Sequence, residues 1–524
     1  MRALPAVVMV LAAIAPVALG APIERTPGTL NRPEASAFAS QLLQLTETIS
    51  SQYVREVSQA DLVLAALQGI HEVARQPFPD GLALDIRNAK TPRDLIPIVT
   101  DARLKIGSVA VLEGIKGLFV AAQAMPRTLD PYCGLVPASD FNSPTDFTVG
   151  FGFELDGEIG ISNGVRRIAP GSGAPGPGTQ QAPPIPFRIT RIYPGGPAQR
   201  AGLRPGDVIA QVDGRNVTAE TGLTIWQEVL LMPVDPTSPR DTVFVVLRKG
   251  SDKPLKISAS KQVYTPESVF GVRRGEDNGW DWWLDKEKRI ACIRIGAIDP
   301  KTPGQLGDAL AEIRDAKGLI LDLRWCPGGF LNPSADIAGL FMGNGKIASM
   351  KYRQPDRQGA TEFNAGVGLN RVQFRSAPLL LLVNGDTSGG GELIACALQD
   401  NERAMVAGQR TLGKGSVQTP VYLPGITEWS FRLTAGTFNR PSGKNLQRFP
   451  DSKKEDPWGV QPDKGFEINV SPAMAQRLKV WHEEFALRPG KSREALPLDD
   501  PEADSQREAA LRLIRKRIAD NDQP

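Results

Sequence analysis

Apolar residues recur at helical spacing along the first part of the chain. Between residues 34 and 141 they recur on one face of each predicted helix. Two groups show this pattern: Leu42, Leu43, Leu45 and Ile49, and then Leu62, Leu64, Leu67 and Ile70. A turn-like stretch at 129–132 ends this pattern. We therefore predict a helical N-terminal region over residues 34–141.

Beyond residue 142 the spacing changes to the alternation that is typical of β-strands. Residues 147–161 alternate and contain glycines, and another short alternating strand begins at Phe187. Between them, residues 171–186 are rich in Gly and Pro and have no apolar period, which is typical of a mobile loop. We predict a β module over residues 142–265 that contains this segment as an insertion.

Strands and helices alternate between residues 266 and 480. The predicted strands are 290–295, 318–323 and 378–383, and the predicted helices are 303–316, a segment after Asn332, and 392–400. Such alternation indicates an α/β core with a mixed sheet. Residues 481–524 are charged and lightly apolar, so we expect a C-terminal tail with one candidate helix over 505–519. The predicted fold class is thus α/β, in a multi-domain α+β chain that is too long for one core.

A short apolar segment opens the chain. Arg2 precedes an apolar run from Leu4 to Leu19, and small residues up to Ala21 follow, which is the layout of a secretory signal. A membrane anchor is the alternative, but two prolines interrupt the run, and it is shorter than the ~20 residues of a spanning helix. We predict that residues 1–21 are a signal peptide. The product would be exported to the periplasm or beyond, without a stable membrane span.

Charge and cysteine content exclude several classes of protein. The formal net charge is only +3, with basic and acidic residues interspersed, so nucleic acid is not an expected partner. Four cysteines are too few and too scattered for a disulfide-dense scaffold or a CxxC zinc site: Cys133, Cys292, Cys326 and Cys396. We expect no metal and no cofactor. An oxidising compartment permits a disulfide, whose pairing the sequence leaves open.

The β module carries a specific resemblance. The strings PGGPA at 194–198 and AGLRPGDVIAQVDG at 201–214 give the order strand, turn, short helix, turn and strand. They resemble bacterial PDZ modules, which implies that Gly150, Phe151, Gly152 and Phe153 receive the terminal carboxylate of a peptide. Backbone amides in such a loop can form an anion-binding nest, and the next strand edge can pair with an extended peptide. A plain β-bulge is the alternative for these four residues. The implied partner is the C-terminal segment of a protein or peptide.

Four further strings lie in the predicted α/β core. They are LDLRWCPGG at 321–329, LVNGDTSGGGE at 382–392, QD at 399–400 and TLGKGSVQ at 411–418, and the first two begin in predicted strands. Active sites of α/β proteins collect at the carboxyl ends of such strands. Their order and spacing resemble the C-terminal processing (tail-specific) peptidases of family S41 over roughly residues 34–480. The resemblance implies a serine-type peptidase.

The choice of general base follows from the residues themselves. The chain has only two histidines, His71 and His482, and neither is near a nucleophile-like motif in the sequence, so a Ser/His/Asp triad is not expected. A lysine base needs burial to lower its pKa from about 10.4 toward ~7–8. Lys414, between two glycines, is the best candidate. Gly328 and Gly329 offer unobstructed N–H groups for an oxyanion.

The resemblance assigns further roles and exposes one departure. It implies Lys414 as the base, Gln418 as its orienting neighbour, and supporting roles for three residues: Glu392, Asp400 and Thr411. The family keeps its nucleophile three positions before the glutamate, and this position is Gly389 here. The nearest hydroxyl belongs to Ser388, one residue early, and such a shift redirects a side chain by roughly 100° on a helix.

Two functions therefore remain open. In the first, Ser388 and Lys414 hydrolyse peptides whose C-termini the PDZ module captures. In the second, the chain is an inactive homologue, a possible pseudoprotease, that acts as a peptide-binding scaffold. Cys326 or Cys396 could replace the serine if Arg324 and Lys414 made an electropositive setting, but buried packing or a disulfide is the alternative. The aromatic cluster at 280–283 is expected to form a packing patch or to line a substrate path.

Overall fold

A computed structural model describes residues 30–138, 148–155, 161–162, 165–166, 187–193, 195–218, 221, 225, 229, 240–264, 267–275, 279–353, 362–366, 374, 377–485 and 504–521. The chain forms two compact units. The first unit comprises residues 1–142, 351–360 and 416–437, and the second comprises 143–350, 361–415 and 438–524. The predicted signal peptide at 1–21 and the Gly/Pro-rich insertion at 171–186 lie outside the described residues.

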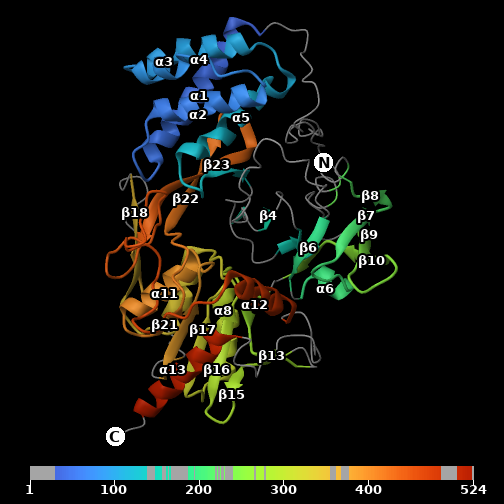
Figure 1. Ribbon diagram of the computed structural model, residues 1–524, viewed down its shortest axis with the longest axis vertical. Coiled ribbons are helices and arrows are strands. Elements are labelled where there is room, and N and C mark those ends of the chain that lie inside the picture. The colour runs from blue at the N-terminus through green and yellow to red at the C-terminus, as the bar shows by residue number, and fades with distance from the viewer. Residues whose placement is uncertain are drawn as a thin grey trace, which may run out of the picture. The chain divides into compact units, whose positions relative to one another are not determined.

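Helices dominate the first unit, as the apolar spacing predicts (Figure 1). Asn31 caps the first helix, because its side chain accepts from the Glu34 N–H at 2.9 Å while the Glu34 carboxylate accepts from the Asn31 N–H at 3.1 Å. The predicted apolar faces are buried in one core that includes Leu42, Ile49, Leu62 and Ile70. The helices are α1 (Arg32–Gln52), α2 (Gln59–Val73), α3 (Leu82–Asn88), α4 (Pro92–Ile106) and α5 (Lys116–Ala124), with 3-10 turns at Ala110–Leu112 and Met125–Thr128.

Three strands complete the first unit. β1 (Gly134–Pro137) and β22 (Ser416–Leu423) both pair antiparallel with the long strand β23 (Ile426–Asn439). Phe431 and Leu433 of β23 are buried in the core of the helices. Segments far apart in the sequence therefore build this unit together. Strand β18 (Lys346–Tyr352), whose last two residues belong to the first unit, pairs antiparallel with β19 (Glu362–Asn364).

The β module is a six-stranded sheet with the order β10-β9-β7-β6-β3, and β8 pairs with β7. Its buried core includes Phe151, Ile189, Ile192 and Phe244. β3 is the terminal strand of this order among the described residues, so one edge of β3 faces away from the sheet. The elements are β3 (Phe153–Leu155), β6 (Phe187–Ile192), α6 (Pro197–Ala201), β7 (Val208–Val212), β8 (Arg215–Asn216), β9 (Asp241–Leu247) and β10 (Leu255–Ser260). Two separate two-stranded pairs also occur in this part of the chain, β2 (Thr148–Gly150) with β11 (Gln262–Tyr264) and β4 (Ile161–Ser162) with β5 (Val165–Arg166).

The central sheet of the second unit is mixed, as predicted. Strands β16 (Ile290–Ile295), β17 (Gly318–Asp322), β20 (Leu379–Val383) and β21 (Met405–Gly408) are parallel, whereas β12 (Val269–Phe270) and β15 (Trp283–Asp285) pair antiparallel with β16. Every residue of β17 and β20 is buried, which is typical of strands covered on both faces. The helices are α8 (Thr302–Glu312), α9 (Leu331–Gly339), α11 (Gly390–Asp400) and α12 (Pro472–Phe485), and β13 (Arg273–Arg274) pairs with β14 (Trp280–Asp281). The α/β multi-domain prediction is confirmed.

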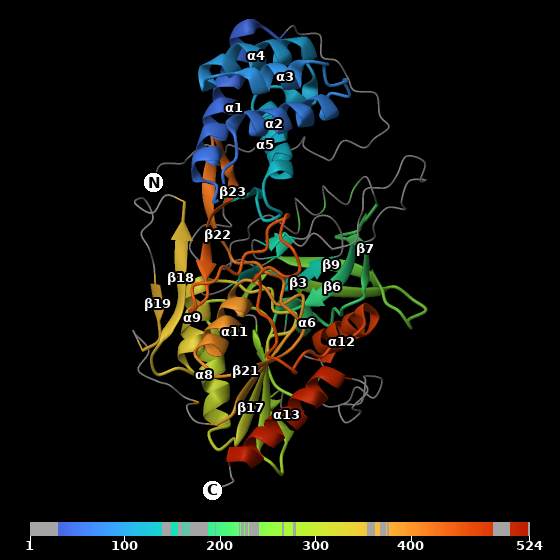
Figure 2. The same cartoon turned by 60° about the vertical axis from the view of Figure 1, so that its left-hand side comes forward.

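The C-terminal helix α13 (Ser505–Asn521) packs against β17 and β20. Ala510, Leu511 and Ile514 are buried in one cluster with Ile320 and Leu380 of these strands. Figures 1 and 2 show the helix running along the sheet. From the sequence we expect residues 481–524 to form a charged tail, because charged residues surround the few apolar ones. In the structure Ala510, Leu511 and Ile514 share one face of α13. Helix α13 is part of the core of the second unit.

No helix in the described part of the chain combines the length and the apolar character that a membrane crossing requires.

Candidate active site

A sharp turn joins the buried strand β20 to helix α11. The Asn384 side chain accepts from the Trp325 N–H at 3.0 Å, and the Thr387 hydroxyl donates to the Leu323 carbonyl at 2.8 Å. Both contacts attach the turn to the loop that follows β17. The LDLRWCPGG and NGDTSGGGE strings are therefore brought together, as predicted from their places at the ends of neighbouring strands.

Gly389 is the residue at this turn from strand to helix. Its φ is +55° and its ψ is −116°, a conformation that costs a residue with a side chain about 1–3 kcal/mol. In hydrolases with a strand–turn–helix site, a residue at such a strained turn presents its side chain at the apex. A Cβ atom on Gly389 would meet its nearest neighbours, the Pro327 carbonyl oxygen and the Gly328 Cα, at 3.7 and 3.8 Å. There is therefore room for a side chain, and glycine supplies none.

Ser388 lies beside this position but points elsewhere. Its hydroxyl donates to the Pro327 carbonyl at 2.8 Å, and its N–H donates to the Cys326 carbonyl at 2.9 Å. The residue is only 5% exposed. Its proton is thus held by a backbone carbonyl of the loop after β17.

The two glycines of that loop make close backbone contacts. A Cβ on Gly328 would come within 2.6 Å of both the Gly390 nitrogen and the Ser388 carbonyl oxygen, so only glycine fits there. Gly329 forms a parallel bridge with Ile298. Of the two predicted oxyanion glycines, Gly328 is thus packed directly on the turn that contains Gly389, whereas Gly329 is packed on Ile298.

Glu392 is the centre of the polar cluster behind the turn. Its buried carboxylate accepts hydrogen bonds from the N–H groups of Gly389, Gly413 and Lys414 at 3.0, 2.7 and 2.7 Å, and from the Thr411 hydroxyl. Burial raises the pKa of Glu392 to about 7, and these four hydrogen bonds act in the opposite direction. Glu392 thereby connects the turn to the segment that contains Lys414. Lys414 itself is partly buried.

Asp400 and Gln418 have hydrogen-bond partners of their own. Asp400, the last residue of α11, accepts from both the Arg440 guanidinium and the Ser442 N–H. Gln418 lies on β22 in the first unit, where its side chain donates to the Tyr132 carbonyl at 2.7 Å. Asp400 therefore orders the 440–443 loop, and a role of Gln418 beside Lys414 stays a prediction.

The cysteines have the properties of core residues. All four are described, buried and present as thiols rather than disulfides. Burial raises the pKa of Cys133 and of Cys292 to about 12 and that of Cys396 still further. The Arg324 guanidinium, which was expected to make the setting electropositive, is held by two carboxylates. These observations favour the packing alternative over a cysteine nucleophile.

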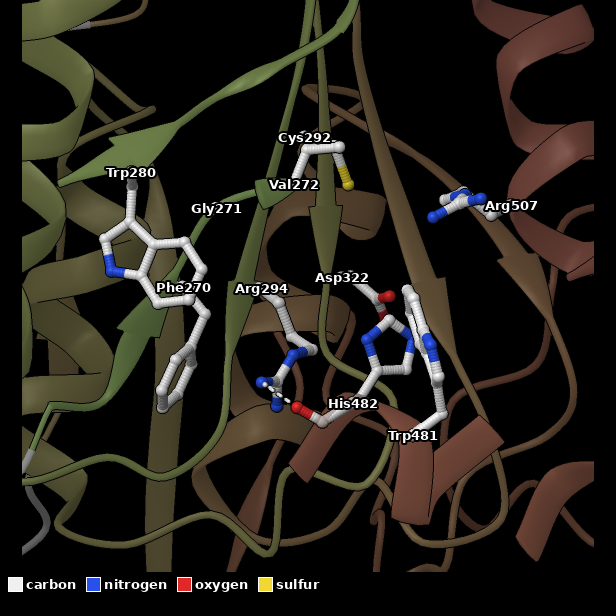
Figure 3. A pocket seen from close by; sticks show the side chains of 10 residues that line it. All are labelled: Phe270, Gly271, Val272, Trp280, Cys292, Arg294, Asp322, Trp481, His482 and Arg507. Atoms are coloured by element: carbon white, nitrogen blue, oxygen red, sulfur yellow. Dashed lines mark hydrogen bonds between the residues drawn. The ribbon is translucent and has the colours of Figure 1, made fainter. Parts of the chain in front are cut away.

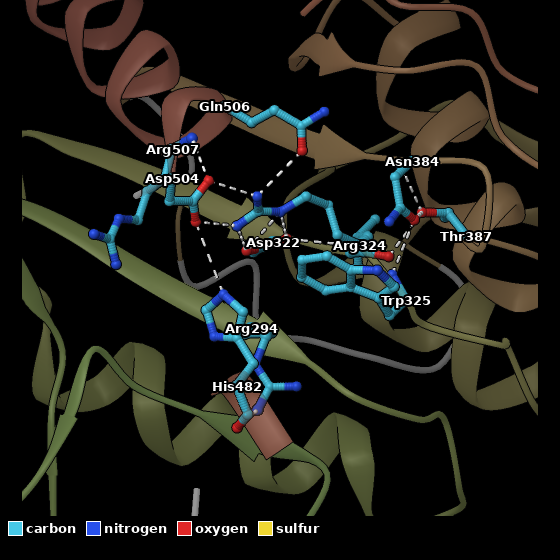
Figure 4. Close-up of polar contacts among 11 residues, drawn as sticks. Arg294, Asp322, Arg324, Trp325, Asn384, Thr387, His482, Asp504, Gln506 and Arg507 are labelled. Atoms are coloured by element: carbon cyan, nitrogen blue, oxygen red, sulfur yellow. Dashed lines mark hydrogen bonds and ion pairs between the residues drawn. The ribbon is translucent and has the colours of Figure 1, made fainter. Parts of the chain in front are cut away.

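Arg324 forms a buried cluster that the sequence does not reveal. It is fully buried and lies between two carboxylates (Figure 4). Its Nε and one terminal nitrogen donate to Asp322 at 2.9 and 2.6 Å, and its two terminal nitrogens donate to Asp504 at 2.8 Å each. Gln506 accepts a further bond at 3.2 Å. The start of the C-terminal segment thus anchors the strand end that leads into the Gly328 loop.

The two histidines are in different surroundings from each other. His71 is buried in the first unit, and burial lowers its pKa. His482 packs on the Trp325 ring at a centroid distance of 5.5 Å, and its Nε2 lies 3.8 Å from Asp504. Burial lowers the pKa of His482 to about 4, while its contact with Asp504 opposes that shift.

Trp280, from the aromatic cluster at 280–283, lines a separate pocket (Figure 3). Its walls also contain Phe270, Arg294, Trp481 and His482. The described residues that line it do not include Ser388, Gly389 or Lys414. Within the described part of the chain, no three His, Cys, Asp or Glu side chains gather as metal ligands would.

The glycine loop of the β module lies between β2 and β3. The Phe151 carbonyl accepts from the Ala198 N–H at 2.7 Å, and the Gly152 carbonyl accepts from the Tyr193 N–H at 2.9 Å. The Phe151 ring is buried in the core of the module. A register irregularity occurs one step later, between Glu154 and Leu155. Residues 150–153 thus form a connected loop and strand start, and peptide binding there stays a prediction.

Two regions of the chain match known protein families. The profile of peptidase family S41 matches residues 289–464, and that of the PDZ domain matches residues 188–233. The carboxy-terminal-processing protease of Bartonella bacilliformis is 26% identical over 425 residues, covering 79% of this chain and 87% of that protein.

A second relative and one solved structure are also similar to this chain. The chloroplastic C-terminal processing peptidase of Tetradesmus obliquus is 27% identical over 295 residues, covering 53% of this chain and 56% of that protein. The solved structure of a photosystem II D1 C-terminal processing protease is 20% identical with a TM-score of 0.41, covering 83% of this chain and 93% of that one.

Proposed function

Because the chain is a PDZ-containing member of peptidase family S41, we propose that it binds the C-terminal segments of peptides and unfolded proteins and does not hydrolyse them. Family membership supports a serine peptidase. The single observation that carries the non-hydrolytic proposal is Gly389. It occupies the strained turn where the family keeps its nucleophile, and it has no hydroxyl.

The surroundings of Gly389 support the same proposal. The one hydroxyl next to it, on Ser388, is 5% exposed and donates to the Pro327 carbonyl. To attack a substrate, this hydroxyl would have to leave that carbonyl and move to the apex of the turn. Loss of a serine nucleophile typically costs several orders of magnitude in rate. A peptide bound beside Gly389 would therefore remain uncut.

Peptide recognition is assigned to the β module. The N–H of a trans peptide unit points opposite to its carbonyl. Since the carbonyls of Phe151 and Gly152 accept hydrogen bonds within the module, the N–H groups of Gly152 and Phe153 point the other way. Together with the outer edge of β3, they suit an extended peptide that ends in a carboxylate.

Hydrolysis by a displaced nucleophile is the second candidate. The observation that favours it is the intact Glu392 cluster, which holds the backbone of Lys414 and of Gly389 around one carboxylate. In this reading Ser388 attacks, Lys414 is the base and Gln418 orients it. Thr411, Glu392 and Asp400 support them, and Gly328 with Gly329 stabilises the oxyanion.

We further propose that residues 1–21 direct export and that the mature chain acts outside the cytoplasm. The support is the sequence alone: a basic start, an apolar run and a small-residue cleavage site. N-terminal sequencing of protein recovered from periplasmic and culture fractions tests it. A mature terminus near Ala21 is expected, and an intact Met1 would contradict it.

The test of function uses an unstructured protein with an apolar C-terminus. The chain without residues 1–21 and its Ser388→Ala and Lys414→Ala variants are compared for both binding and hydrolysis. The proposal predicts that all three bind the substrate and that none hydrolyses it. Hydrolysis by the unaltered chain that both variants lose would establish the second candidate instead.

A further inference from the structure

The segment that contains Lys414 is joined by hydrogen bonds to two other parts of the second unit. The Leu412 N–H donates to the carbonyl of Thr387, in the turn before α11, at 3.0 Å. The Arg448 N–H donates to the Gly413 carbonyl at 2.7 Å. Arg448 is therefore attached to the residue directly before Lys414.

Side-chain packing brings Arg448 and Trp458 onto Gly413. A Cβ atom on Gly413 would lie 2.7 Å from the Arg448 Cβ and 3.0 Å from the Trp458 ring. Gly413 also has a φ of +84°, in the left-handed region that favours glycine. The absence of a side chain at Gly413 thus lets Arg448 and Trp458 pack closely beside the segment that contains Lys414.

The Trp458 ring is in contact with two guanidinium groups. The Arg448 guanidinium lies 4.5 Å and the Arg410 guanidinium 3.4 Å from the ring centroid, within the range of cation–π contacts. Arg410 also donates to the backbone carbonyls of Trp458, Lys454 and Asp456. Arg448 is exposed, so its guanidinium is accessible to a ligand while the ring restricts its motion.

Two cations therefore share one aromatic ring. Burial and then the Arg448 charge lower the pKa of Arg410, while Asp456 and Glu455 act in the opposite direction. Backbone carbonyls and an aromatic ring hold the two guanidiniums in place, and partners of these two kinds do not neutralise a full charge. A negatively charged group bound at Arg448 would reduce the repulsion between the two guanidiniums.

We propose that Arg448 is a specificity-determining residue that binds an acidic side chain of a peptide lying along the segment that contains Lys414. This inference rests on the proposed peptide binding and names the chemistry of its ligand: a peptide with an aspartate or glutamate at one interior position. A guanidinium can donate two parallel hydrogen bonds to a carboxylate, which an ammonium group cannot do. Contact with the Trp458 ring lowers the side-chain entropy that Arg448 loses on binding.

The experiment measures binding of fluorescent peptides that share one apolar C-terminus and contain either Glu or Gln at a single interior position, which is scanned along the peptide. The chain without residues 1–21 should prefer Glu at one position by roughly three- to fivefold at low ionic strength, and added salt should reduce this preference. Arg448→Gln should lower the preference to near unity. Arg448→Glu should reverse it, so that a peptide with Lys at the same position binds best.

The matched control is Arg87→Gln, which removes an exposed arginine of α3 in the first unit and should leave the preference unchanged. If Arg448→Gln keeps the preference, or if the unaltered chain shows none at any position, the role of Arg448 is refuted while peptide binding stands. If the unaltered chain binds none of the peptides, the proposed peptide binding fails and this inference fails with it. A reversed preference in Arg448→Glu cannot arise from unfolding, so it distinguishes a direct contact from a loss of fold.

Discussion

The buried contact between Arg324 and Asp504 allows a sharp prediction about stability. Both side chains are almost inaccessible to solvent, at 0% and 3% exposure, and the two guanidinium–carboxylate bonds are both 2.8 Å long. Asp504→Asn would keep the shape but place an amide beside a buried cation. Removing one partner of a buried ion pair typically costs about 3–5 kcal/mol. We expect the lower part of this range, because Asp322 still accompanies Arg324.

The assay is hydrogen exchange in urea, read by mass spectrometry on peptides that cover β17 and α13, because these two elements pack together. Glu362→Gln is the matched control in the same unit. It removes the charge from an exposed pair with Lys346 at 2.6 Å, whose side chains are 55% and 35% exposed, and it should cost at most about 1 kcal/mol. A cost for Asp504→Asn no larger than that of the control would refute the view that α13 is part of the core.

The same contact gives a pH dependence. Burial alone would raise the pKa of Asp504, but Arg324 and His482 lower it, and the net pKa lies well below the usual range. For a carboxyl whose folded pKa is depressed, the stabilisation is present above the unfolded pKa of about 3.9 and is lost as the pH falls through the folded value. The difference between the unaltered chain and Asp504→Asn should therefore persist from pH 8 to pH 4 and shrink only below that.

The contribution of Glu392 to the free energy of unfolding should change with pH in the opposite direction, because burial raises its pKa from 4.5 to about 7. This contribution is fully present below pH 4.5 and falls by up to about 3 kcal/mol as the pH rises through 7. Urea titrations of the unaltered chain and Glu392→Gln across this range check it, and parallel pH profiles would speak against it. The four buried thiols should react slowly with a thiol reagent at pH 8 in the native state and all react once the chain is unfolded, because burial raises the pKa of Cys133, Cys292 and Cys396. One rapidly labelled cysteine in the folded chain would contradict the packing interpretation.

The sequence predicts those parts of the fold that depend on local pattern. The helical spacing of residues such as Leu42 and Ile49 corresponds to α1, and the largely apolar strands at 318–323 and 378–383 correspond to β17 and β20. Burial on one face leaves a periodic pattern, and burial on both faces leaves an apolar run. The contribution of α13 is not visible in this way. Its buried apolar residues, Ala510, Leu511 and Ile514, stand among many charges, and this pattern does not indicate a core helix without its partner strands.

In the candidate site too, some features follow from the sequence pattern and others depend on tertiary packing. The strings containing Gly328 and Glu392 begin in predicted strands, so their proximity follows from topology. The direction of the Ser388 hydroxyl does not, because it depends on which carbonyl of the facing loop accepts its proton. The pairing of Arg324 with Asp504 is equally hidden, since 180 residues separate the partners and only the packing of α13 brings them together.

The central claim is that position 389 lacks the nucleophile, and a single substitution tests it most directly. Gly389→Ser has room for its Cβ, at the cost of a strained φ of +55°. Hydrolysis of an unstructured protein would be measured for the unaltered chain, Gly389→Ser, and Gly389→Ser combined with Ser388→Ala or Lys414→Ala. We predict background rates for the unaltered chain and a gain in Gly389→Ser that survives Ser388→Ala and is lost with Lys414→Ala. Hydrolysis by the unaltered chain that Ser388→Ala abolishes would contradict the claim.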